Sequence, residues 1–261
     1  MQRSTHPHLE ALLVRGWALL PDFIDRGLLA ELADAMAPSL AMRDAIRREN
    51  GVTANADGTL HHLLADAPCY VELLSALEPL TPIFDRFFEG KYILNSYGGV
   101  ANRSQMHAYV QEIHRDIRFG TDAKRFMLNA LVMLDDFTLE NGATHLLPGS
   151  QHLPEKPGHE AFYAEAERAT GTAGSVLLFD SRVWHAAGIN HTSSPRRALT
   201  LTFTCPFFKQ QLDYPRLFGY DRLAGCDAWL RQLIGFNART PESLNEFYVP
   251  VERRFYQRGQ D

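Results

Sequence analysis

Seven short runs of β-forming residues, separated by turn residues and not by helices, constrain the fold of this chain more than any other feature. Turn chemistry lies between them at Gly98-Gly99, Asn141-Gly142 and Pro148-Gly149. Many short strands at such spacing favour a closed or sandwiched antiparallel sheet. The runs that we expect to form strands are Tyr92–Tyr97, Met106–His114, Phe126–Leu134, Thr144–Leu147, Val176–Phe179, Trp184–Gly188 and Ala198–Phe203.

The residues before these runs indicate helices. Asp22 or Asp25 can cap a helix, because the apolar residues that follow keep helical spacing. Thr81 is a natural N-cap for another helix, and Pro82 fits its first position. The segment 43–67 between these helices is polar and rich in turn residues, so we expect a solvated loop or a lid there.

We expect a single domain over residues 1–261, mainly β with helical cladding. It divides into a helical N-terminal part (about 1–90), a barrel core (about 91–208) and a C-terminal segment (209–261) that wraps the barrel. At 45% hydrophobic and 22% charged residues the chain has an ordinary globular composition, which excludes a disordered or collagenous protein.

Charge and cysteine content narrow the class of protein. The 31 acidic and 26 basic residues leave a net charge of −5, so no basic field predicts binding to nucleic acid or to an anionic membrane. No apolar run approaches the roughly 18 residues that span a bilayer, and the start shows no secretory signal. The three cysteines form no CxxC pair and are expected to be reduced. We therefore expect a cytoplasmic protein.

The chemistry is expected around His114 and Asp116. Two residues apart in a strand, their side chains project to the same face and can share one ion. His185, which lies 69 residues after Asp116 in a short predicted strand, is the candidate for a third ligand. Two imidazoles and one carboxylate on one side of an ion are typical of non-haem Fe(II) oxygenases. The alternatives are a Zn²⁺ or Mn²⁺ hydrolase or isomerase with the same ligands, and a barrel that only binds.

Several segments, in this order, resemble the phytanoyl-CoA dioxygenase family of Fe(II)/2-oxoglutarate oxygenases. The resemblance covers most of residues 12–208, departs from the family pattern at Ser175 and at the inserted Gln151, and fades towards the C-terminus. The matching segments are Gly16–Phe23, His114-Arg115-Asp116, Glu140–Thr144, Pro148–His152, Gly174–Asp180, Trp184–Asn190 and Arg196-Arg197.

This resemblance implies a double-stranded β-helix, or jelly roll, with iron near its mouth and with 2-oxoglutarate and O₂ as cosubstrates. Arg196, 11 residues after His185, matches the arginine that binds the distal carboxylate of 2-oxoglutarate, and Arg197 is the alternative. The implied reaction hydroxylates an unactivated C–H bond of a small-molecule metabolite and releases succinate and CO₂. Desaturation, epimerisation and cyclisation are alternative outcomes of the same iron chemistry.

Further residues are weaker candidates. Asn129 interrupts an apolar run and could contact the cosubstrate or be a buried amide bonded to backbone. Gln111 and Asn95 resemble positions that touch 2-oxoglutarate in relatives. Arg118 shares the parity of His114 and Asp116, so it could bind an anionic substrate or be solvated, and Phe119 could be a pocket wall or part of the core. Specificity is expected from the loops 43–67, 100–105 and 152–172.

Overall fold

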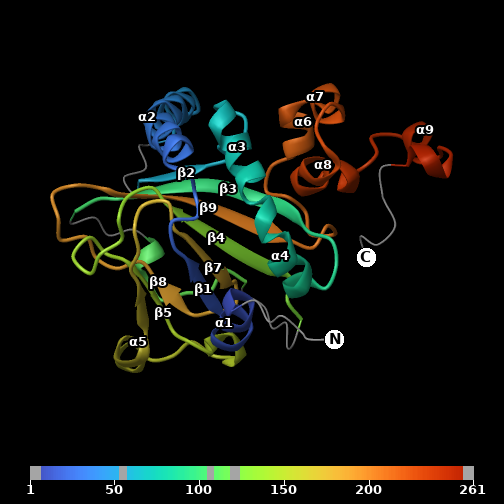
Figure 1. Ribbon diagram of the computed structural model, residues 1–261. Helices are drawn as coiled ribbons and strands as arrows, with labels where there is room; N and C mark the ends of the chain where they lie inside the picture. The colour runs from blue at the N-terminus through green and yellow to red at the C-terminus, as the bar shows by residue number, and fades with distance from the viewer. Residues whose placement is uncertain (1–6, 53–57, 105–108, 118–123, 255–261) are drawn as a thin grey trace.

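The chain folds into two antiparallel sheets that face each other, with helices on the outside (Figure 1). The computed structural model describes residues 7–52, 58–104, 109–117 and 124–254. The large sheet has the strand order β1-β7-β4-β9-β3-β2, and the small sheet has the order β6-β5-β8. Apolar residues from both sheets, among them Leu131 and Leu146, form one buried cluster between them. The predicted fold class, mainly β with helical cladding, is confirmed.

Six of the seven predicted strands are present, with ends shifted by a few residues, and three short strands were not predicted as such. The strands are β1 (Trp17–Leu20), β2 (Thr59–His61), β3 (Ile93–Asn102), β4 (Met127–Met133), β5 (Thr144–Leu146), β6 (Glu167–Ala169), β7 (Val176–Asp180), β8 (His185–Ala186) and β9 (Arg196–Thr204).

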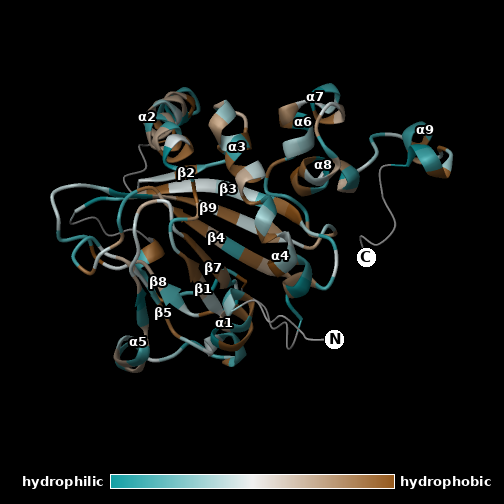
Figure 2. Ribbon diagram, in the orientation of Figure 1, coloured by the Kyte–Doolittle hydropathy of each residue, from teal (hydrophilic) through white to brown (hydrophobic). Residues whose placement is uncertain are grey.

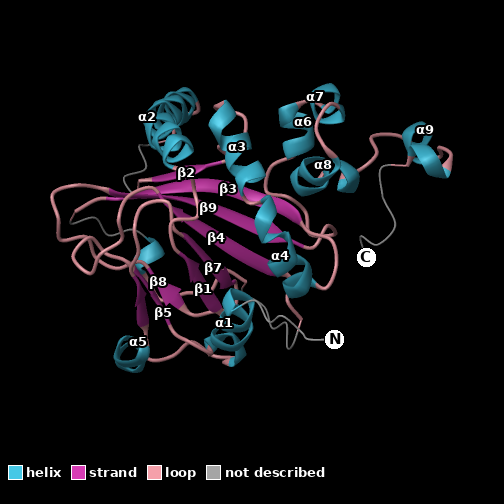
Figure 3. Ribbon diagram, in the orientation of Figure 1, coloured by secondary structure: helices cyan, strands magenta, loops and turns pink. Residues whose placement is uncertain are grey.

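Helices α2, α3 and α4 cover the outer face of the large sheet, and α5 lies beyond the small sheet (Figures 1 and 3). Of the two predicted cap candidates, Asp22 and Asp25, it is Asp25 that caps α2: its side chain accepts a hydrogen bond from the Gly27 amide at 2.8 Å. The helices are α1 (Pro7–Arg15), α2 (Arg26–Glu49), α3 (Pro68–Ala76), α4 (Thr81–Phe88), α5 (His159–Glu165), α6 (Tyr214–Phe218), α7 (Tyr220–Ala224), α8 (Ala228–Ile234) and α9 (Leu244–Phe247).

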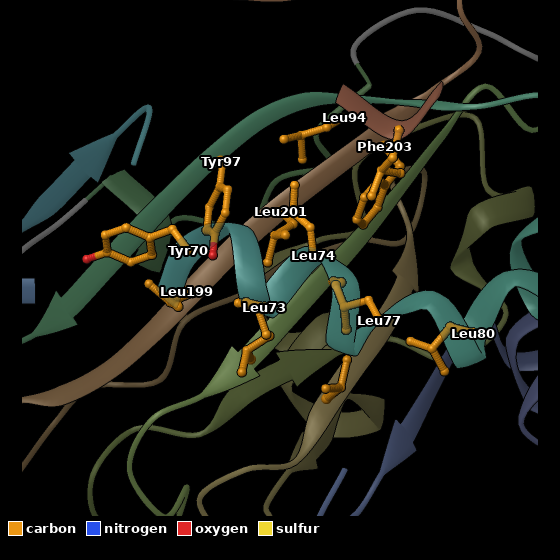
Figure 4. Packing of buried hydrophobic residues seen from close by; sticks show 14 of the residues in the cluster. Tyr70, Leu73, Leu74, Leu77, Leu80, Leu94, Tyr97, Leu199, Leu201 and Phe203 are labelled. Carbon is orange, nitrogen blue, oxygen red and sulfur yellow. The ribbon is translucent and has the colours of Figure 1, made fainter. Parts of the chain in front are cut away.

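The alternation of strand β9 separates two environments. Leu199, Leu201 and Phe203 point to the helix side, where they pack beneath α3 (Figure 4). Residues of the other parity, such as Ala198, face the space between the sheets. Figure 2 shows the resulting apolar colouring of the large sheet. Burial of each large apolar side chain contributes about 1.5–3 kcal/mol, so the helix-covered layer is the main stabilising core.

Three local predictions are wrong. Thr81 does not cap α4: Leu80 is the N-cap, Thr81 is the first helical residue, and its hydroxyl donates to the Glu78 carbonyl at 2.7 Å. The run predicted as a strand over 106–114 contains a 3-10 helix, η2 (Tyr109–Gln111), and His114 then forms an isolated bridge. The segment 43–67, predicted as a loop or lid, holds the end of α2 and the strand β2. Arg43 fixes this segment, because its guanidinium donates to the carbonyls of Ser39, His61 and His62 at 2.6–3.0 Å.

The C-terminal segment contributes to the same core as the N-terminal helices. Tyr214, Phe218, Leu230 and Leu233 from α6 and α8 belong to the helix-side cluster. Helix α9 extends away from the body of the molecule (Figure 1). The three cysteines are free thiols. None of the helices in the described part of the chain combines the length and the apolar character needed to cross a membrane.

Leu201→Ala tests the helix-covered core. Leu201 is fully buried, so its truncation leaves a cavity and is expected to lower the free energy of unfolding by about 2–5 kcal/mol. Urea denaturation followed by circular dichroism measures the change. Val14→Ala, at a side chain that is 66% exposed, is the control and should change stability by less than about 0.5 kcal/mol. Equal effects of the two variants would contradict this description of the core.

Candidate metal centre

His114 and His185 are brought together by their backbones. The His114 amide donates to the His185 carbonyl at 3.0 Å, and the His185 amide donates to the His114 carbonyl at 2.9 Å. Directly paired residues of antiparallel segments point their side chains to the same face. The two imidazole rings accordingly lie with centroids 4.2 Å apart. His185, the candidate for the third ligand, is thus brought to His114 by an isolated β-bridge between two distant segments of the chain.

Asp116 joins this pair from the segment that follows. Its backbone amide donates to the Ser181 carbonyl at 2.9 Å, which ties the segment to the connection between β7 and β8. The Asp116 carboxylate oxygens lie 3.6 Å from His114 Nε2 and 3.8 Å from His185 Nε2. One candidate ligand atom from each of the three residues lies within 4.8 Å of the other two.

Each imidazole is oriented so that Nε2 is available to an ion. His114 Nδ1 lies 2.7 Å from the Glu112 carbonyl, and His185 Nδ1 lies 2.9 Å from the Val183 carbonyl. A carbonyl oxygen only accepts, so Nδ1 carries a proton, and Nε2 is the nitrogen that can bind an ion through its lone pair. This pattern is the usual support for a metal-binding histidine. The donor set of two imidazoles and one carboxylate therefore fits a divalent metal ion.

The three side chains of the candidate metal centre, His114, Asp116 and His185, differ in solvent exposure. His185 is 7% exposed and its ring packs against Phe179 of β7 at 4.9 Å. The side chains of His114 and Asp116 are 25% and 35% exposed. An ion held here would have protein on the His185 side and an accessible face on the Asp116 side. Such an open face allows a small molecule to bind the ion directly.

Asn129 and Thr202 fix the Asp116 carboxylate. These two residues are register partners in β4 and β9 and face the space between the sheets. Asn129 Nδ2 donates to Asp116 Oδ2 at 2.8 Å, and the Thr202 hydroxyl donates to Asn129 Oδ1 at 2.9 Å. Both ends of the amide are therefore occupied, and the carboxylate orientation depends on the pairing of two strands. The Asn129 side chain is thus bonded to two side chains, a carboxylate and a hydroxyl, and not to the backbone.

Arg196 is a buried cation at the other end of β9. It is 2% exposed, its guanidinium lies over the Phe137 ring at 4.1 Å, and Nη1 donates to the Gly142 carbonyl. Its Nε has no hydrogen-bond partner among the described residues. Burial, and then the neighbouring Arg168, lower the pKa of Arg196 to about 10, against an opposite effect of Asp135. The guanidinium stays charged at pH 7 and can bind an anion.

Arg196 faces the same space between the sheets as the candidate metal ligands His114, Asp116 and His185. Arg196 and Thr202 have the same parity in β9, so both project between the two sheets. Arg197, the alternative, points to the helix side, where it donates to both oxygens of Asp135 at 2.7–3.0 Å. Its charge is already paired there.

The other predicted residues lie in different places. Asn95 is buried on β3, and its amide donates to Thr204 Oγ1 at 3.3 Å and to the Lys209 carbonyl at 3.0 Å. Gln111 lies at the end of η2, on the wall of a pocket outside the small sheet. Arg118 and Phe119 fall outside the described residues. Thr202 was not predicted, although its parity with Arg196 in the same strand could have indicated it.

Comparison with known proteins identifies a family and a relative that match most of this chain. The family model for phytanoyl-CoA dioxygenase (PhyH) matches residues 14–198. The uncharacterized protein Rv1501 of Mycobacterium tuberculosis is 32% identical over 257 residues, which cover 96% of this chain and 94% of that protein.

Two further similarities concern parts of the chain or its fold. The iron/alpha-ketoglutarate-dependent dioxygenase penM of Penicillium thymicola is 36% identical over 101 residues, covering 35% of this chain and 32% of that protein. The crystal structure of EctD from S. alaskensis with 2-oxoglutarate and 5-hydroxyectoine superposes with a TM-score of 0.64 at 20% identity and covers 78% of each chain. This likeness confirms the expected jelly-roll fold.

Asn129→Ala tests the support of the carboxylate. Without the amide, Asp116 loses its orienting hydrogen bond, and the affinity for Mn²⁺ is expected to fall about 10- to 100-fold. Thr202→Val should weaken binding less, because the amide itself remains. Isothermal titration of the apoprotein with Mn²⁺ measures both. Thr200→Val, on the same face of β9, is the matched control, and a loss there as large as in Asn129→Ala would contradict a specific role.

Proposed function

Because this chain belongs to the phytanoyl-CoA dioxygenase family, we propose that it hydroxylates an unactivated C–H bond of a small-molecule metabolite. In this reaction one O₂ is consumed: one oxygen atom enters the product alcohol and the other enters succinate, while 2-oxoglutarate loses CO₂. Fe(II) is the metal, and 2-oxoglutarate and O₂ are the cosubstrates. The observation that carries the proposal is the cluster of two Nε2 atoms and one carboxylate on the inner side of the small sheet.

His114, Asp116 and His185 are the proposed iron ligands. Three protein ligands on one side leave coordination positions for 2-oxoglutarate and O₂, which is the arrangement of non-haem Fe(II) oxygenases. When bound, the iron supplies the activation of O₂ that no side chain can supply. The protein holds both imidazoles in the Nδ1-protonated form through the carbonyls of Glu112 and Val183. Halogenation of the substrate would require a halide ion in the coordination position that the Asp116 carboxylate fills. The presence of this carboxylate therefore favours hydroxylation.

Arg196 is the proposed partner of the distal carboxylate of 2-oxoglutarate. Its charge is buried without a carboxylate partner among the described residues, and such a charge is costly to leave unpaired. A carboxylate that binds there removes this cost and gains charge-assisted hydrogen bonds in a site of low dielectric. The shared parity of Arg196 and Thr202 places this cation on the face of β9 that also supports Asp116.

The first test is the stoichiometry of oxygen transfer. With Fe(II), 2-oxoglutarate and ¹⁸O₂, the protein is expected to form succinate with one ¹⁸O atom, and the hydroxylated product gains the other. Mass spectrometry measures both. Asp116→Ala should abolish succinate formation, because the remaining two ligands hold iron weakly. Turnover with Zn²⁺ or Mn²⁺ in the absence of 2-oxoglutarate would instead support a non-redox hydrolase or isomerase.

Arg196→Ala tests the cosubstrate site. Loss of the guanidinium is expected to raise KM for 2-oxoglutarate about 10- to 100-fold, because a charge-assisted contact is lost. The affinity for Mn²⁺ should stay unchanged, since Arg196 is not a proposed metal ligand. Initial rates of succinate formation measure KM, and Arg86→Ala, at an exposed arginine of α4, is the control. An unchanged KM would mean that another residue binds the distal carboxylate.

A further inference from the structure

A pocket of about 580 Å³ lies outside the small sheet. In β5, Leu146 pairs with His185 and belongs to the cluster between the sheets. The neighbouring residue, His145, pairs with Ala186 and therefore points to the opposite face. His145 lines the pocket, together with residues of α5, β6 and η2. The pocket and the candidate metal ligands thus lie on opposite faces of the small sheet.

The charged lining of the pocket is predominantly basic. Among the lining residues, Lys156 and Arg168 contribute two cations against the single carboxylate of Glu112. Glu140, outside the lining, acts electrostatically on Arg168 without forming an ion pair with it. Neither cation forms an ion pair with a carboxylate within the described ranges. In a chain with a net charge of −5, such a local excess of positive charge favours an anionic ligand.

Arg168 is held in place before any ligand arrives. Its Nε donates to the Ala143 carbonyl at 2.9 Å and Nη2 donates to the Leu139 carbonyl at 3.0 Å. A Cβ atom at Gly188 would lie 2.7 Å from Nη2, so glycine leaves the space that the guanidinium fills. The guanidinium is therefore pre-oriented, which lowers the entropic cost of binding an anion.

Neutral donors and an apolar wall complete the pocket. Burial, and then Arg168, lower the pKa of His145 to about 4, so its imidazole is neutral at pH 7. Its ring packs edge-on against Tyr163 at 5.0 Å. Ile113, Leu139 and Ile189 form an apolar wall, and the last two are more than half exposed. The volume lies in the range of small-molecule sites, which are mostly apolar with a few polar groups.

We propose that this outer pocket binds a small organic anion, a carboxylate or phosphate ester with a short apolar portion, as a ligand separate from 2-oxoglutarate. The anionic group binds Lys156 and Arg168, and the apolar portion covers Leu139 and Ile189. The proposed site does not depend on the oxygenase reaction, because His145 and its register partner Arg168 lie on the face of the small sheet opposite to His185.

The test uses four probes on the full chain: phenyl phosphate, benzoate, inorganic phosphate and the uncharged benzyl alcohol. Isothermal titration calorimetry is expected to show binding of phenyl phosphate or benzoate, at least tenfold weaker binding of inorganic phosphate, and none of benzyl alcohol. The tighter of the two organic anions identifies the group that the pocket prefers. Lys156→Gln and Arg168→Gln should each raise Kd at least tenfold, because a charge-assisted contact is lost.

Two further variants locate the binding. Lys91→Gln removes an exposed cation elsewhere on the surface and should leave Kd unchanged. Asp116→Ala should also leave the Kd of the organic anion unchanged, because the substitution alters the candidate metal centre and not the outer pocket. Binding that is lost in Asp116→Ala, or that 2-oxoglutarate displaces, would place the anion at the metal centre and overturn the proposal. So would the absence of binding by every probe, or equal binding of benzyl alcohol. None of these outcomes bears on whether the protein is an oxygenase.

Discussion

The two backbone hydrogen bonds that His114 and His185 exchange are the constraint on which the site depends. They join segments 71 residues apart and set both imidazoles on one face. The side chains then need little further support, because each Nδ1 donates to the carbonyl two residues before it in the chain. The geometry of the imidazole pair is thus a consequence of sheet pairing. A metal ion would find these two ligands already oriented, which reduces the cost of ordering them on binding.

The backbone near Gly142 and Gly188 separates two cations with different surroundings. A Cβ at Gly142 would lie 2.3 Å from the Gly188 carbonyl oxygen, so the two segments pack as bare backbone. Arg196 lies on the interior side and Arg168 on the outer side, and each donates to a carbonyl of the segment 139–143. Burial is the main cause of the lowered pKa of Arg196, and the charge of Arg168 contributes to it across this backbone. Two guanidinium groups therefore lie on opposite sides of this backbone and still interact electrostatically.

Much of this arrangement could be predicted from the sequence, and the rest required pairing between distant segments. Local sequence predicted six of the strands, a cap for α2 at Asp22 or Asp25, and the convergence of His114 with Asp116. The sequence also drew attention to Asn129 as a polar residue in an apolar strand. Its contact with Asp116 and Thr202 could not be predicted, because it depends on the register of β4 against β9. For the same reason the strand predicted over 106–114 was wrong: the chain bends through η2 so that a single bridge can reach His185.

The carboxylate of Asp116 is the most exposed member of the candidate metal-ligand set. His185 is almost fully buried, whereas Asp116 is about one-third exposed and is oriented by one amide. That amide is fixed by Thr202 in β9, the strand that also carries Arg196 about 20 Å away along its length. One strand therefore determines both the orientation of the acid ligand and the position of the buried cation. A slip of β9 by two residues would keep every side chain on its face but move both groups by about 7 Å. The pairing of β9 with β3 on one side and β4 on the other prevents this slip.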